Sequence, residues 1–95
     1  MVSVLSDLER VLIDRRENPP SSGSYSATLL ADPEVAQRKI MEEAFELCME
    51  LGRPQPDPQR TVEEAADLVF HVLAGLVGAR VPLDAVLGEL TGRRR

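Results

Sequence analysis

The sequence predicts an all-α protein, a bundle of four to five helices. Apolar residues recur at helical spacing, helix-start and helix-stop residues punctuate the chain, and no run alternates polar and apolar residues as a strand would. With 95 residues, the chain is expected to form a single domain, 1–95, with a modest core. Two expected helices are apolar around most of their circumference, which favours a bundle completed by homodimerisation.

The N-terminal part is expected to hold one helix, a loop and a short helical turn. Residues 4–17 carry apolar side chains at helical spacing, and Ser3 before them is a suitable N-cap. Prolines, serines and a glycine in 18–23 break any helix. Residues 24–31 can then form one short helical turn.

The first acidic helix is expected over residues 33–51. Asp32 followed by Pro33 is a helix-start signal, and Gly52 is a stop signal. A rotation of about 100° per residue places the charged residues on one narrow stripe. This stripe consists of Lys39, Glu43, Glu46 and Glu50.

The second acidic helix is expected to start at Thr61, which with Glu64 matches a capping box, and to end near Arg80. It is apolar apart from one stripe, which consists of Glu64, Asp67, His71, Gly75 and Gly78. An ionised Asp67 in so apolar a segment needs partners, because burying an unpaired charge is costly or forces protonation. A last helix is expected to open at Pro82.

Charge and composition exclude several classes of protein. A net charge of −5 argues against a nucleic-acid binder, which usually carries a basic face. The apolar stretch after Asp67 is interrupted by His71 and two glycines. It is also too short to span a bilayer, which takes about 20 residues, so no membrane partner is expected. The single cysteine, Cys48, excludes an internal disulfide framework and indicates a reducing compartment, so a cytoplasmic location is expected. Its place on an apolar helix face predicts that it lies in the core.

Four carboxylates form two pairs on the two acidic helices. Each pair is spaced three residues apart, Glu43 with Glu46 and Glu64 with Asp67, so its members share one helix face. Antiparallel packing would bring the pairs together, where they would repel and raise one another's pKa without a cation. Such hard oxygen ligands suit Mg²⁺ or Mn²⁺. A solvated, glutamate-rich helix face is the alternative, and the spacing alone does not decide between them.

Four other side chains are candidate substrate contacts. Lys39, one turn before the first carboxylate pair, can form a helical ion pair or contact a phosphate. Arg15 and Arg16 end the first helix, where they favour its dipole, and they can also reach an anionic ligand. His71 can orient a carboxylate, contact a phosphate or ligate a metal, and we favour a hydrogen-bonded structural role over direct ligation.

The chain resembles a known enzyme family in three segments that occur in the same order. They are SYSATLL at 24–30, KIMEEA at 39–44 and VEEAADLVFH at 62–71. The carboxylate pattern EEAFE followed by EAAD is similar to that of the MazG-like, all-α nucleotide pyrophosphohydrolases. The three segments together resemble, within that superfamily, the phosphoribosyl-ATP pyrophosphatases of histidine biosynthesis.

The resemblance implies Mg²⁺-dependent hydrolysis of the small-molecule nucleotide 1-(5-phosphoribosyl)-ATP to 1-(5-phosphoribosyl)-AMP and pyrophosphate by a helical homodimer. Carried over by position, it implies catalytic metal ligands at Glu43, Glu46, Glu64 and Asp67, with Glu42 and Glu63 as further ligands or support. Two alternatives stay open. One is the same chemistry on another nucleoside triphosphate, and the other is a non-catalytic helical dimerisation module.

Overall fold

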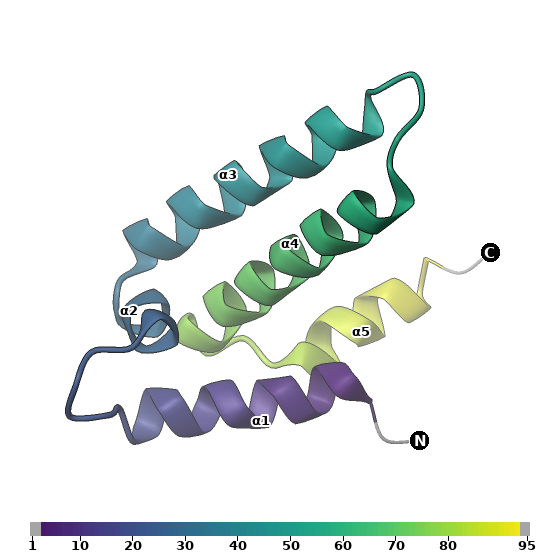
Figure 1. The fold of residues 1–95 in the computed structure, drawn as a ribbon. Coiled ribbons are helices and arrows are strands. Elements are labelled where there is room, and N and C mark those ends of the chain that lie inside the picture. The colour runs from purple at the N-terminus through teal and green to yellow at the C-terminus, as the bar shows by residue number, and fades with distance from the viewer. Residues whose placement is uncertain (1–2, 94–95) are drawn as a thin grey trace.

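The computed structural model describes residues 3–93, and every regular element in that range is a helix. In chain order the helices are α1 (Val4–Glu17), α2 (Tyr25–Ala31), α3 (Pro33–Leu51), α4 (Pro58–Gly78) and α5 (Leu83–Thr91). Figure 1 shows α3 and α4 as a long antiparallel pair, with α2 at the end of the pair remote from its connecting loop and with α1 and α5 below the pair. The all-α prediction is confirmed.

The predicted boundaries of α1 and α3 are correct because their caps form as expected. The side-chain oxygen of Ser3 accepts a hydrogen bond from the backbone N–H of Leu5 at 3.1 Å. The side-chain oxygen of Asp32 accepts a hydrogen bond from the backbone N–H of Glu34 at 3.0 Å, and Pro33 is the first residue of the helix. The short turn expected after residue 23 is the helix α2.

The predicted start of α4 is wrong by one turn. Asp57 is the N-cap and accepts a hydrogen bond from the N–H of Gln59 at 2.9 Å, and Pro58 opens the helix. This Asp-Pro signal, the same one that starts α3, prevails over the capping box expected at Thr61. Thr61 instead bonds back to the carbonyl oxygen of Asp57 at 2.8 Å, and Glu64 is not used as a cap.

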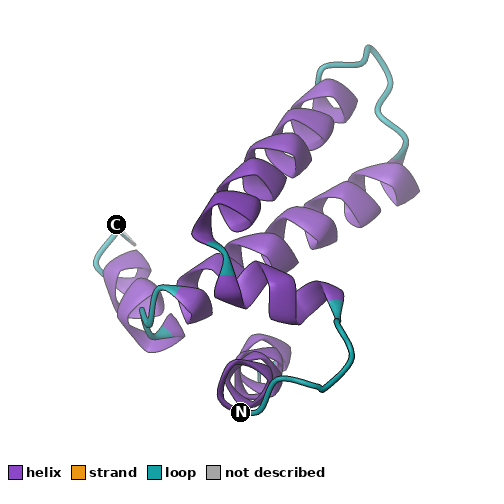
Figure 2. Ribbon diagram, turned by 90° about the vertical axis from the view of Figure 1, so that its left-hand side faces the viewer, coloured by secondary structure: helices purple, strands orange, loops and turns teal. Residues whose placement is uncertain are grey.

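Helix α4 is the centre of the fold and contacts each of the other four helices. Around its C-terminal half lies a core of residues from α1, α2, α4 and α5, namely Leu12, Leu29, Leu30, Leu73, Ala74, Val77 and Leu83. The side view in Figure 2 shows α3 and the N-terminal half of α4 extending away from this core. The core therefore anchors one end of the α3–α4 pair.

Glycine lets the chain pack closely where α4 meets α2. A Cβ atom on Gly78 would lie 3.1 Å from the carbonyl oxygen of Leu30, and one on Gly75 would lie 3.2 Å from the Cδ1 atom of Ile40. Gly78 thus permits close packing against α2, and Gly75 permits it against α3. Helix α5 starts at Leu83, one residue later than predicted, because Pro82 takes the N-cap position.

No single helix among residues 3–93 is long and apolar enough to cross a membrane. Helices α4 and α5 reach that length and composition only when taken together, and they are bent by 117° at their junction.

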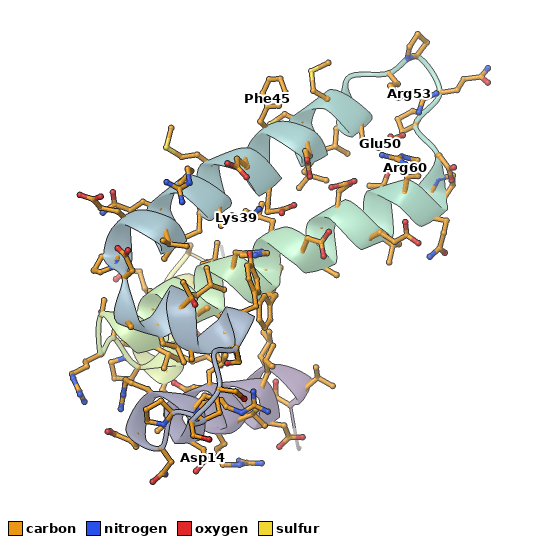
Figure 3. All side chains as sticks on the ribbon, turned by 60° about the vertical axis from the view of Figure 1, so that its left-hand side comes forward. Asp14, Lys39, Phe45, Glu50, Arg53 and Arg60 are labelled. Carbon is orange, nitrogen blue, oxygen red and sulfur yellow. The ribbon has the colours of Figure 1, made fainter. Side chains whose placement is uncertain are left out.

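The outer face of α3 carries large apolar side chains that the single chain leaves exposed. Met41, Phe45 and Met49 are 73%, 64% and 60% exposed. Figure 3 shows Phe45 on the side of α3 turned away from α4. Cys48, predicted to lie in the core, is also exposed in the single chain, because only α4 and α2 pack against α3.

Candidate metal centre between α3 and α4

Three carboxylates from the two long helices converge between them. Glu43 of α3 and both Glu64 and Asp67 of α4 each offer one oxygen, and these oxygens lie within 4.8 Å of one another. The antiparallel pairing of α3 and α4 brings the two acidic stripes face to face, as the spacing predicts. We call these three residues the carboxylate cluster.

The cluster holds acidic groups that are costly to ionise. Glu43 is only 9% exposed, and burial is the main cause that raises its pKa, followed by the neighbouring Glu46 and then by Asp67. Burial also raises the pKa of Glu64, and Glu46 again adds to the effect. The Oε2 atoms of Glu43 and Glu64 are buried and have no hydrogen-bond partner among residues 3–93. Unpaired buried oxygens of this kind are where a cation would be most stabilising.

The enclosed carboxylate is not the one that the sequence favoured. Asp67 lies in the most apolar segment of the chain, yet this residue is exposed to solvent, whereas Glu43 is nearly enclosed. The reason is the pairing of α4 with α3, which covers Glu43 but leaves Asp67 at the edge of the helix pair. The apolar neighbourhood of Asp67 therefore indicated the position of the cluster, but the buried residue in it is Glu43.

The remaining acidic residues of the predicted ligand set lie outside the three-residue cluster. Glu46 is exposed, but it is close enough to Glu43 and Glu64 to raise the pKa of both. Glu42 is on the surface, where it pairs with Lys39 at 3.1 Å. Glu63 is also on the surface and accepts a hydrogen bond from Gln59 at 3.2 Å. The structure brings neither Glu42 nor Glu63 into the cluster.

Figure 3 shows Lys39 on the side of α3 that faces α4, one helical turn before Glu43. Its pKa is raised, chiefly by Glu42, with further contributions from Tyr25 and Glu43. The lysine is therefore a cation held next to a group of carboxylates.

His71 takes the structural role that we favoured. It is 6% exposed, and both ring nitrogens have partners. Nδ1 lies 2.6 Å from the carbonyl oxygen of Asp67, and Nε2 lies 2.6 Å from the hydroxyl of Tyr25. Both ring nitrogens of His71 are therefore engaged by protein partners. The sequence argument missed Tyr25, although this residue belongs to the SYSATLL segment.

The two arginines at the end of α1 are used elsewhere. Arg16 donates to the carbonyl oxygen of Val77 at 2.7 Å, near the C-terminal end of α4. Val77 is about 15 Å along the helix from Asp67, at about 1.5 Å per residue. Arg15 donates to Ser26 of α2 at 3.4 Å. The structure therefore does not bring either arginine into the carboxylate cluster.

Glu50, expected on the same stripe as Glu43, ties down the loop between α3 and α4. It is 5% exposed and accepts a hydrogen bond from the N–H of Asp57 at 2.9 Å. Arg53 and Arg60 also donate to it, each at 3.3 Å (Figure 3). These partners, the N–H of Asp57 first, hold the pKa of Glu50 below its usual value of 4.5. Arg60 also reaches Glu64 at 3.5 Å, so this loop is connected to the cluster.

The fold and the cluster define a small all-α protein with a carboxylate centre between its two long helices. The model of the family described as phosphoribosyl-ATP pyrophosphohydrolase matches residues 5–94. The chain belongs to this family. The resemblance found in the sequence is thereby confirmed, and with it the class of enzyme, a hydrolase of histidine biosynthesis.

Individual relatives agree over almost the whole chain. A phosphoribosyl-ATP pyrophosphatase of Methanosphaerula palustris is 40% identical over 98% of this chain and 94% of its own length. One of Halobacterium salinarum is 38% identical over 99% of this chain and 100% of its own length. The histidine biosynthesis bifunctional protein his7 of Schizosaccharomyces pombe is 39% identical over 98% of this chain, which spans only 21% of that protein.

Proposed function

We propose that this chain hydrolyses 1-(5-phosphoribosyl)-ATP to 1-(5-phosphoribosyl)-AMP and pyrophosphate, with Mg²⁺ held by Glu43, Glu64 and Asp67. Membership of the family supports the substrate. The observation that carries the site is the pair of buried, unpartnered Oε2 atoms of Glu43 and Glu64, in a group whose oxygens lie within 4.8 Å. No other cluster among residues 3–93 combines three such ligand atoms.

The donor set fits a small, hard divalent cation. Mg²⁺ favours carboxylate oxygens, keeps several of its waters and binds substrate phosphates, and Mn²⁺ accepts the same ligands. Asp67, which is exposed at the edge of the cluster, leaves an open side for such waters and phosphates. When bound, the ion supplies charge neutralisation of the triphosphate and a lower pKa for the attacking water.

The surrounding residues have separate tasks. Glu46, exposed beside Glu43 and Glu64, is placed to complete the ligand set or to accept a proton from the attacking water. Lys39, now paired with Glu42, is placed to exchange that partner for a phosphate oxygen. Glu50 and Arg60 hold the loop and the first turns of α4, and so fix where Glu64 stands.

A second copy of the chain completes the bundle in this proposal. The exposed side chains of Met41, Phe45 and Met49 form one apolar strip along α3. Burying large apolar side chains contributes about 1.5–3 kcal/mol each, so a face of this kind is a strong site for association. Packing α3 and α4 against the same pair from a partner would give a four-helix bundle. A cytoplasmic location remains part of the proposal.

Direct comparison of substrates tests the proposed activity. The purified chain is incubated with Mg²⁺ and, in separate reactions, phosphoribosyl-ATP, ATP and dCTP, and the products are separated by chromatography. We expect phosphoribosyl-AMP and pyrophosphate from the first reaction and little turnover of the other two. Faster cleavage of an ordinary nucleoside triphosphate would contradict the substrate and favour the alternative of the same chemistry on another nucleotide.

A further inference from the structure

Two hydrogen bonds through His71 connect α2 to the turn of α4 that carries Asp67. The hydroxyl of Tyr25 lies 2.6 Å from Nε2 of His71, and Nδ1 of His71 lies 2.6 Å from the carbonyl oxygen of Asp67. A carbonyl oxygen only accepts hydrogen bonds, so Nδ1 carries the proton. In a neutral imidazole with this tautomer, Nε2 accepts and the Tyr25 hydroxyl donates.

The imidazole is held firmly between these partners. His71 is 6% exposed, and its ring meets the rings of Tyr25 and Phe70 edge-on, with centroids 5.6 Å and 5.2 Å apart. In contrast, the carboxylate of Asp67 accepts no hydrogen bond from any side chain in residues 3–93. Its placement therefore depends on the backbone of α4, to which His71 adds a side-chain hydrogen bond beside those of the helix itself.

We propose that Tyr25 is a positioning residue of the candidate metal centre: its hydroxyl fixes His71, which fixes the turn of α4 that presents Asp67 to Glu43 and Glu64. This inference rests on the proposed function, because it needs the cluster to bind a cation. Groups that orient metal ligands from behind change metal affinity or activity by about 10- to 100-fold when they are removed. Tyr25 belongs to α2, and no argument from carboxylate spacing includes it.

The position of Tyr25 supports a link between the cation site and the side where substrate would arrive. Tyr25 is 51% exposed as a residue, so it lies at the edge of the core, while its hydroxyl makes a part-buried hydrogen bond to His71. Lys39, the proposed phosphate contact, is close enough to Tyr25 for the tyrosine to contribute to its raised pKa, after Glu42. Tyr25 is thus near Lys39 and in contact with His71.

Composition makes the inference easy to test, because the chain contains one tyrosine and one histidine. Tyr25→Phe keeps the ring and removes only the hydroxyl. Free Mn²⁺ is measured by electron paramagnetic resonance during titration of the wild-type chain and the variant, without substrate. We expect the variant to bind Mn²⁺ about tenfold more weakly. The control is Thr91→Val, which removes an exposed hydroxyl that bonds only to Leu87 of its own helix, and it is expected to keep wild-type affinity.

A spectroscopic measurement separates positioning from general loss of structure. The ¹⁵N imidazole signals belong to His71 alone, so no assignment is needed. We expect the wild-type chain to show the tautomer protonated at Nδ1, with Nε2 in a hydrogen bond. In Tyr25→Phe the Nε2 signal is expected to move towards that of an unbonded acceptor, while the circular dichroism of the helices stays unchanged.

The outcomes are distinct. A folded Tyr25→Phe chain that binds Mn²⁺ as tightly as the wild type overturns the inference, whatever its rate of hydrolysis. If the wild-type chain binds Mn²⁺ and the variant binds it more weakly, but neither cleaves phosphoribosyl-ATP, the inference stands and the substrate proposal fails. A wild-type chain that binds no Mn²⁺ overturns both the cation site and the role of Tyr25.

Discussion

The carboxylate of Glu9 in α1 accepts a hydrogen bond from the backbone N–H of Leu83 at 2.8 Å, across a separation of 74 residues. Leu83 is the first residue of α5, and the N-cap position before it is Pro82, which offers no side-chain hydrogen bond. The first N–H groups of a helix have no partner within the helix. Glu9 supplies the missing cap and ties the last helix to the first.

Replacement of Glu9 by alanine is expected to lower the free energy of unfolding by about 1 kcal/mol, as the loss of an N-cap does elsewhere. Urea denaturation followed by circular dichroism measures this change. The control is Glu89→Ala, which removes a carboxylate that is 72% exposed and is expected to change stability by at most a few tenths of a kcal/mol. Equal stabilities for the two variants would show that Glu9 does not act as the cap of α5.

Glu50 is expected to make the stability of the fold depend on acid. Its pKa lies below 4.5 in the folded chain, because the N–H of Asp57 and the charges of Arg53 and Arg60 favour the ionised form. The stabilisation is thus present above pH 4.5 and is lost as the pH falls through the folded pKa. Glu50→Gln should be clearly less stable than the wild type at about pH 7, and this difference should shrink at about pH 3. Urea midpoints that differ equally at both values would contradict this account.

The close approach of α4 to α2 gives a test of the packing. Gly78→Ala would place a Cβ atom 3.1 Å from the carbonyl oxygen of Leu30, a backbone atom that cannot easily move. We expect a loss of about 1–3 kcal/mol. Gly88→Ala in α5 is the matched control, since a Cβ there meets nothing within 4 Å, and it should gain up to about 1 kcal/mol from helix propensity. Opposite signs in thermal unfolding are the expected result, and a neutral Gly78→Ala would refute the close packing.

The outer face of α3 predicts the effect of a charge on assembly. Phe45→Glu is expected to convert the proposed dimer into a monomer of 10.5 kDa, because a buried unpaired charge at the contact is costly. Sedimentation velocity measures the two masses. Val4→Glu changes a residue of α1 that is 79% exposed, and this control should remain dimeric. A wild-type chain that sediments as a monomer would remove the dimer from the proposal.

Local signals in the sequence were sufficient for most of the helices. Ser3 and the Asp32–Pro33 pair predicted the starts of α1 and α3 because each cap involves only neighbouring residues. The start of α4 was missed because two valid cap signals, at Asp57 and at Thr61, lie within one turn of each other. A periodic apolar pattern could not decide between them, since the intervening residues are polar.

The candidate site was predicted less completely, because several of its contacts join distant parts of the chain. The three-residue spacing of Glu64 and Asp67 placed them on one face, and the pairing of helices then brought them to Glu43. The Tyr25–His71 bond spans 46 residues, so no local pattern contains it. Glu50 lies on the same stripe of α3 as Glu43. Its carboxylate nevertheless accepts a hydrogen bond from the N–H of Asp57, at the end of the loop after α3, and does not join the cluster.

The central claim is that the carboxylate cluster binds the cation with which phosphoribosyl-ATP is hydrolysed. The most direct test is pyrophosphate release from phosphoribosyl-ATP over a Mg²⁺ titration, for the wild type, Asp67→Asn and the control Asp84→Asn on the exposed side of α5. We predict release that requires and saturates with Mg²⁺ in the wild type and the control, and a rate lower by about 100-fold or more in Asp67→Asn. Release without Mg²⁺, or wild-type release from a folded Asp67→Asn chain, would contradict the account.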